Sequence, residues 1–170
     1  FINGPHLGAY LREMEDRVLS AYDVVTVGEM PGVTVEDANE YAGADGPLDM
    51  VFHFDHMRLD NADNEDDPWD FQDWELIDLK ETFTRWQEGL YPGSWNALYL
   101  NNHDQPRQVS RFGDDEHYRE ESAKLLATFL HTLRGTPFVY QGEEIGMTNV
   151  PFENADQLED VETIRYVERM

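Results

Sequence analysis

The sequence predicts an α/β fold built on a parallel sheet. Short apolar segments typical of strands alternate along the chain with longer segments in which apolar residues recur at helical spacing. The short segments are almost continuously apolar, which is typical of parallel strands that are buried on both faces. Strands that alternate with helices indicate a parallel sheet, so the order and the composition of the segments favour the same class.

Local signals predict where the helices lie and end. We predict helices over residues 5–22, 34–41, 76–90, 114–134 and 158–168. Pro5 suits a first helical turn, and Thr34 and Asp37 have the spacing of a capping box. Gly135, with Pro137 just beyond it, predicts the end of the longest helix.

The apolar segments predict strands over residues 23–29, 48–54, 96–101 and 136–140. We expect a single domain, because 170 residues suffice for one ordinary core. Such a set of strands fits half of a (β/α)8 barrel, which typically needs about 250 residues, or a complete small doubly wound domain. Periodicity leaves both architectures open, and the polar residues distinguish them better.

Charge and composition exclude several classes of protein. The formal net charge is −24, from 36 acidic against 12 basic residues, which argues against binding to a nucleic-acid backbone. The chain has no cysteine, so disulfides and thiolate metal sites are excluded. It has no apolar run long enough for a membrane span and no basic, apolar signal segment at its start. We therefore expect a cytoplasmic protein that binds neither nucleic acid nor membrane.

Two carboxylates follow predicted strands. Glu29 ends the strand over 23–29, and Asp104 lies just past the strand over 96–101. Ligands bind at the carboxyl ends of parallel strands, so we expect both carboxylates to point into one mouth. Two carboxylates, one of them held protonated, suit the cleavage of a glycosidic bond. The structural alternative is that Glu29 caps the next turn and Asp104 stabilises a loop with Arg107.

Two further polar residues flank Asp104. His103 and Arg107 can donate hydrogen bonds to hydroxyl and carboxylate groups. Pro106 fixes the turn between them. For His103, a satisfied core histidine is the more common case and stays open as an alternative.

Other suggestive patterns are predicted not to form sites. His53 and His56 are three residues apart, and on a strand such residues face opposite sides, so we expect no metal site there. The acidic loop over 60–67 lacks the glycine and the terminal glutamate of a calcium-binding EF-hand loop. Residues 140–146 do not form a dinucleotide-binding fingerprint and indicate a turn after a strand.

Three motifs occur together in the chain: Val27 to Met30, Asn101 to Arg107, and Gly135 to Gly146. In this order they resemble the α-amylase superfamily of glycoside hydrolases, glycoside hydrolase family 13. More narrowly, they are similar to its oligo-1,6-glucosidase, dextran glucosidase and α-glucosidase group. Asn3 to His6 and Phe112 to Asp114 also resemble this group, so the resemblance runs over nearly the whole chain.

The resemblance implies a (β/α)8 TIM barrel with an inserted domain and a C-terminal β domain. Residues 1–170 would form the second half of the barrel, strands 5 to 8 with their helices. Strands 1 to 4, the inserted domain, the family's calcium-binding loop and the C-terminal β domain would be absent. We therefore expect no metal and no other cofactor.

The resemblance also implies the roles of residues. Glu29 would be the general acid/base, and Asp104 the carboxylate that stabilises the transition state. We predict His103, Arg107 and Met30 as substrate-binding residues. The family nucleophile is an aspartate that precedes the acid/base glutamate, and no strand precedes Glu29 here. The motif over 58–60 has a similar composition but follows Glu29, so it is rejected.

The implied parent is a retaining α-glucosidase that hydrolyses α-1,6 or α-1,4 bonds of short oligosaccharides, and the isolated chain is expected to be inactive. A trehalose-6-phosphate hydrolase or a sucrose isomerase of the same superfamily stays open, as does a non-catalytic sugar-binding or assembly fragment. The unpaired strand edges at 24–29 and 136–140 predict association with the missing half of the barrel or with a second copy.

Overall fold

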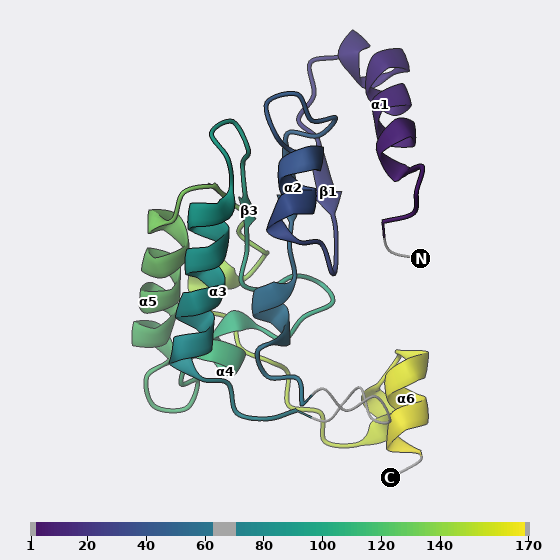
Figure 1. Ribbon diagram of the computed structural model, residues 1–170. Helices are drawn as coiled ribbons and strands as arrows, with labels where there is room; N and C mark the ends of the chain where they lie inside the picture. Colours follow the sequence, from purple (N-terminus) through teal and green to yellow (C-terminus); the bar gives the residue numbers. More distant parts are fainter. Residues whose placement is uncertain (1–2, 63–70, 169–170) are drawn as a thin grey trace.

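The computed structural model describes residues 3–62 and 71–168, and its strands are short and parallel (Figure 1). They are β1 (Val27–Glu29), β2 (Met50–Phe52), β3 (Ala97–Leu98) and β4 (Thr136–Pro137). β1 pairs with β2 and β3 with β4, each in parallel. A parallel bridge between Val51 and Asn96 links the two pairs, so the strands follow one another in chain order. The prediction of a parallel sheet is confirmed.

Each strand is shorter than predicted, because fewer residues pair with a neighbouring strand than the apolar segments contain. Val24 and Val25 precede β1 and are 51% and 72% exposed, although the sequence predicts a buried strand there. β2 ends at Phe52, and the chain turns directly into a 3-10 helix, η2 (Asp55–Arg58). β1 and β4 each pair on one side only within the described residues.

The predicted helices are present, with shifted ends. They are α1 (Leu7–Arg17), α2 (Val35–Tyr41), α3 (Leu76–Gly89), α5 (Arg119–Thr132) and α6 (Val161–Val167). Three further short turns of 3-10 helix are η1 (Leu19–Ala21), η3 (Glu143–Ile145) and η4 (Ala155–Gln157). The capping box at the start of α2 is confirmed: Thr34 Oγ1 accepts from the Asp37 N–H at 3.2 Å, and the Asp37 carboxylate accepts from the Thr34 N–H at 2.9 Å.

One predicted helix start is wrong. The helix expected from residue 114 begins at Arg119, and a separate short helix, α4 (Gln108–Phe112), precedes it. Asp114 accepts hydrogen bonds from the N–H groups of Glu116 and His117, at 3.1 and 2.8 Å. A side chain that binds nearby backbone in this way competes with the helical hydrogen bonds, so the helix cannot extend back to this position.

Two apolar clusters hold the helices on the strands. The first joins α2, α3 and β2 and contains Val33, Ala38, Tyr41, Ala42, Leu48, Val51, Trp86 and Leu90. The second joins α3, α5 and β3 and contains Leu79, Phe83, Leu98, Leu100, Val109, Leu126 and Leu130. Figure 1 shows α3 and α5 running side by side, and the rings of Phe83 and Phe129 meet edge to face at 4.9 Å.

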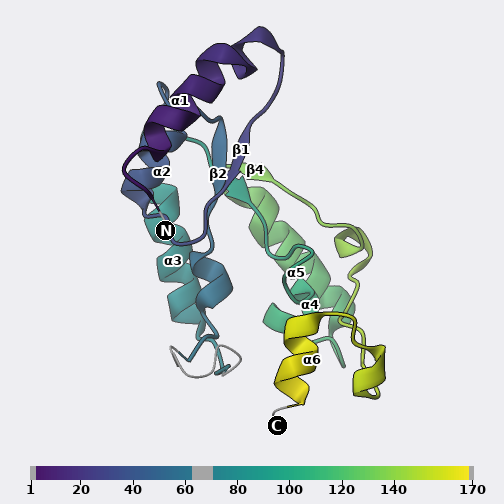
Figure 2. The same cartoon turned by 90° about the vertical axis from the view of Figure 1, so that its right-hand side faces the viewer.

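The first helix is attached more loosely. α1 has no buried residue, and Tyr10 on its apolar stripe is 65% exposed. Both views place α1 at the opposite end of the molecule from α6 (Figure 2). None of the helices in the described part of the chain combines the length and the apolar character needed to cross a bilayer.

Candidate active site

The carboxyl ends of all the strands meet around one cavity of about 240 Å³. β1 contributes Glu29, its last residue. Phe52 ends β2, and the remaining lining residues follow β2, β3 or β4. They are Phe54 after β2; Tyr99, Asn101, Asn102 and His103 after β3; and Phe138, Val139 and Tyr140 after β4. This is the edge of a parallel sheet where ligands bind, so the strand topology brings residues from four distant segments to one place.

Aromatic rings form the walls of this cavity. Phe52 contacts Phe138 at a centroid distance of 4.7 Å and Tyr99 at 5.2 Å, both edge to face. The Tyr99 hydroxyl donates to the His53 carbonyl oxygen at 3.0 Å, which fixes the ring. Burial, and after it the negative charge of Glu29, raise the pKa of Tyr99 well above its ordinary value. Aromatic walls with a few polar groups are typical of sites for small organic ligands.

Asn101 places a side-chain amide at the cavity, and the sequence did not predict this residue as part of the site. It is buried at 2% exposure, and neither its Oδ1 nor its Nδ2 has a hydrogen-bond partner among the described residues. A buried amide without a partner is costly, and Asn101 also lines the cavity, so it is a candidate group for binding a ligand hydroxyl. Its place in the motif Asn101 to Arg107 was the only sequence signal for it.

Asp104 lies beside this cavity rather than in it. Its Oδ2 lies 3.2 Å from Nε2 of His103, which lines the cavity, and its N–H donates to Asn102 Oδ1 at 2.8 Å. Asp104 lines an adjacent hollow of about 490 Å³, and Phe54 lines both spaces. The structure therefore places Glu29 and Asp104 in neighbouring hollows that share one wall.

Arg107 contacts the wall of the cavity from outside. Its guanidinium stacks over the Tyr140 ring at 4.9 Å and donates to the Gln141 carbonyl oxygen. Its backbone N–H donates to Asn149 Oδ1 at 2.7 Å. Glu143 holds the same loop, because its Oε2 accepts from the Tyr140 N–H at 2.6 Å. Arg107 thus orders the loop that carries Tyr140.

Met30, predicted to bind substrate, is partly buried at the edge of the core. Its side chain packs against the first apolar cluster, and it does not line the cavity that contains Glu29. Its N–H donates to the Phe52 carbonyl oxygen at 3.2 Å and so extends the pairing of β1 with β2.

The prediction that His53 and His56 point apart is wrong. β2 ends before them and η2 curls back, so their rings meet at 4.8 Å. His53 also stacks on Trp86 at 3.9 Å, and His56 Nε2 lies 2.8 Å from the Tyr99 carbonyl oxygen. Residues 3–62 and 71–168 contain no group of three or more His, Cys, Asp or Glu that could hold a metal ion. Most of the acidic loop over 60–67 lies outside the described residues.

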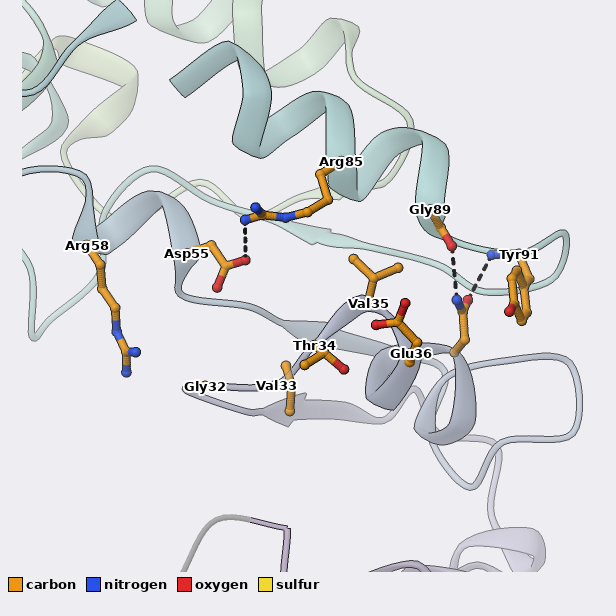
Figure 3. A pocket seen from close by; sticks show the side chains of 11 residues that line it. Gly32, Val33, Thr34, Val35, Glu36, Asp55, Arg58, Arg85, Gly89 and Tyr91 are labelled. Atoms are coloured by element: carbon orange, nitrogen blue, oxygen red, sulfur yellow. Dashed lines mark hydrogen bonds and ion pairs between the residues drawn. The ribbon is translucent and has the colours of Figure 1, made fainter. Parts of the chain in front are cut away.

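A larger hollow of about 750 Å³ lies between α2, η2 and α3 (Figure 3). Several of the polar groups that line it are already paired with neighbouring residues. Asp55 Oδ2 accepts from Arg85 and from the Trp86 indole N–H, both at 2.8 Å. The Asn39 side chain donates from Nδ2 to the Gly89 carbonyl oxygen and accepts at Oδ1 from the Tyr91 N–H. We therefore place the candidate site at the strand ends and not in this hollow.

Comparison with known proteins agrees with the geometry. The family model for the alpha amylase catalytic domain matches residues 1–169. An oligo-1,6-glucosidase from Halalkalibacterium halodurans is 58% identical over 165 residues, which cover 96% of this chain and 29% of that protein.

Solved structures give the same extent of similarity. A trehalose-6-phosphate hydrolase from Bacillus licheniformis matches with a TM-score of 0.87 at 43% identity, over 98% of this chain and 31% of that one. An isomaltulose synthase from Erwinia rhapontici matches with a TM-score of 0.87 at 40% identity, over 98% of this chain and 30% of that one. This chain therefore spans less than a third of the length of these relatives.

Proposed function

The chain belongs to the α-amylase catalytic-domain family, and on that basis we propose that it supplies strands 5 to 8 of a (β/α)8 barrel in a retaining α-glucosidase. The proposed substrates are short oligosaccharides with α-1,6 or α-1,4 glucosidic bonds. The observation that carries this proposal is the position of Glu29, at the carboxyl end of β1 in an aromatic-walled cavity that His103 also lines. The 58% identity to an oligo-1,6-glucosidase favours the α-1,6 bond.

In this proposal Glu29 is the general acid/base. A retaining glycosidase uses one carboxyl group to protonate the leaving oxygen and later to activate water. Glu29 is exposed at the edge of the cavity, so the leaving oxygen and then the attacking water can both reach its carboxyl group. Asp104 and His103 would bind the sugar hydroxyls next to the reacting carbon. Arg107 would position the ring of Tyr140 in the wall of the cavity. Met30 would hold the end of β1, where Glu29 lies, through its backbone hydrogen bond to Phe52.

The experiment that tests this role is replacement of Glu29 by glutamine in the 170-residue chain, mixed with the part of the Halalkalibacterium halodurans relative that the chain does not match. We expect kcat for isomaltose to fall about a hundredfold to ten-thousandfold, the usual contribution of a general acid/base. Glu36→Gln is the matched control, because Glu36 is exposed in the first turn of α2 and lies outside the cavity. A Glu29→Gln enzyme with kcat close to that of the control would contradict the proposal.

We also propose that the 170-residue chain is inactive alone and pairs with a complementary set of strands. The covalent step of a retaining enzyme needs a nucleophilic carboxylate, and the motif expected for it does not precede Glu29. The outer edges of β1 and β4 offer free backbone groups for pairing. A net charge of −24 makes a second copy the less favourable partner, because the copies repel each other.

The similarity to a trehalose-6-phosphate hydrolase keeps a phosphorylated disaccharide as the second candidate substrate. Arg107 is engaged by Gln141 and Tyr140, and it therefore offers little to a phosphate group. A higher kcat/KM for trehalose 6-phosphate than for isomaltose would favour this second candidate.

A further inference from the structure

A second arginine near the candidate site, Arg111, joins two of its loops. Arg111 lies in the five-residue helix α4, and its side chain is only 6% exposed. Its Nε and Nη2 donate to the two oxygens of Asp60, at 2.8 and 2.5 Å. Nη2 also donates to the Met57 carbonyl oxygen at 2.8 Å, and Nη1 donates to Gln105 Oε1 at 2.7 Å. The planar guanidinium is thus bound on all sides.

These partners come from the ends of neighbouring strands. Met57 and Asp60 belong to the segment after β2, whereas Gln105 belongs to the segment after β3 and directly follows Asp104. The Trp74 indole N–H donates to the Arg111 carbonyl oxygen at 3.1 Å, which fixes the backbone of α4 as well. A lysine could not reproduce this set of contacts, because it lacks the fork of donors in one plane.

The same residues line one hollow together with Asp104. Asp60, Asp104, Gln105 and Arg111 all line the hollow of about 490 Å³. The Asp104 side chain is 63% exposed, and the one side-chain partner found for it among the described residues is His103. Its direction therefore depends on the backbone turn, in which the Asp104 N–H donates to Asn102 Oδ1 at 2.8 Å. The Gln105 side chain ties the other end of this turn to Arg111.

We infer that Arg111 is a positioning residue that, through Gln105, holds Asp104 in the orientation needed for the reaction. This inference rests on the proposed function for the role of Asp104. Because both Asp60 oxygens are bound by Arg111, Asp60 acts as the counter-charge of Arg111. The arginine therefore contributes geometry rather than charge to the sugar.

The test uses Gln105→Met in the 170-residue chain mixed with the part of the Halalkalibacterium halodurans relative that the chain does not match. Methionine keeps the length of the side chain but replaces the amide oxygen that accepts from Arg111 with a much weaker acceptor, a thioether sulfur. The expected result is a fall in kcat of roughly tenfold to a hundredfold with KM changed by less than about threefold. Arg111→Lys should lower kcat similarly, and the double variant should lose no more than the worse single variant. Gln157→Met, in η4, is the matched control and should retain the wild-type kcat.

Amide hydrogen exchange of residues 101–107 gives a readout that does not need activity. Exchange at Asp104 should be faster in Gln105→Met than in the wild type and unchanged in Gln157→Met. Unchanged exchange in Gln105→Met would overturn the inference, and so would additive losses of kcat in the double variant. A wild-type mixture that cleaves no α-glucoside would instead refute the proposed function, and the exchange result would still decide whether Arg111 positions Asp104.

Discussion

Replacing Trp86 with alanine is expected to lower the free energy of unfolding by about 3–5 kcal/mol, a large part of the stability of an ordinary domain. Trp86 lies in α3 with 0% exposure and belongs to the first apolar cluster. Its indole stacks on His53 with the rings 6° from parallel, and its N–H donates to Asp55 Oδ2. Truncation therefore removes packing, a ring stack and a hydrogen bond at once.

Chemical denaturation of two further variants separates these terms. Trp86→Phe keeps most of the buried ring but leaves Asp55 without the indole donor, so we expect a cost of about 1–3 kcal/mol. Trp95→Ala is the control, because Trp95 is 41% exposed and donates one hydrogen bond, to Thr136. Its cost should be clearly smaller than that of Trp86→Ala. Equal costs for the two alanine variants would contradict the packing described for α3.

The second large effect is expected on acidification. Burial, and after it the positive charge of Arg85, lower the pKa of His53 to about 3. Burial also lowers the pKa of His56, and the nearby His53 and Arg111 act in the same direction, whereas the Tyr99 carbonyl and Asp55 oppose them. Both imidazoles stay neutral in the folded chain at a pH where the unfolded chain would protonate them.

The sign of the effect follows from proton binding. Below the unfolded pKa of about 6.5 the unfolded chain binds more protons than the folded chain, so stability falls as the pH falls. Protonation of each histidine in the unfolded chain should lower the free energy of unfolding by about 2 kcal/mol between pH 7 and pH 5. The loss continues for His53 down to its folded pKa of about 3.

His56→Gln isolates this contribution, because the glutamine amide can still donate to the Tyr99 carbonyl oxygen that His56 Nε2 approaches at 2.8 Å. The free energy of unfolding of this variant should depend less on pH than that of the wild type, by about 1.4 kcal/mol per unit below pH 6. His117→Gln, at a side chain 75% exposed, is the matched control and should keep the wild-type slope. Identical slopes for all three proteins would contradict the burial of a neutral His56.

The sequence predicted the parts of this fold that depend on local pattern. The presence of the strands, the parallel class of the sheet and the capping box at Thr34 were all predicted from the pattern of the segments. The pattern failed at the strand ends, because β2 ends at Phe52, inside the strand predicted over 48–54, and η2 begins at Asp55. That error separated His53 from His56, whose rings are in contact.

The candidate site was predictable to a similar degree. The positions of Glu29 at the end of β1 and of His103 after β3 followed from the rule that parallel strands end at one edge. The contacts of Arg111 with Met57 and Asp60 could not be predicted in this way. They join residues 54 and 51 positions apart through side-chain geometry that no local pattern encodes.

The measurement that most directly tests the account is isomaltose hydrolysis by the 170-residue chain, alone and mixed with the part of the Halalkalibacterium halodurans relative that the chain does not match. The account predicts no glucose release by the chain alone and release by the mixture, lost when the chain carries Glu29→Gln. Hydrolysis by the chain alone would contradict the claim that these residues form half of a catalytic barrel, and so would a mixture that stays inactive.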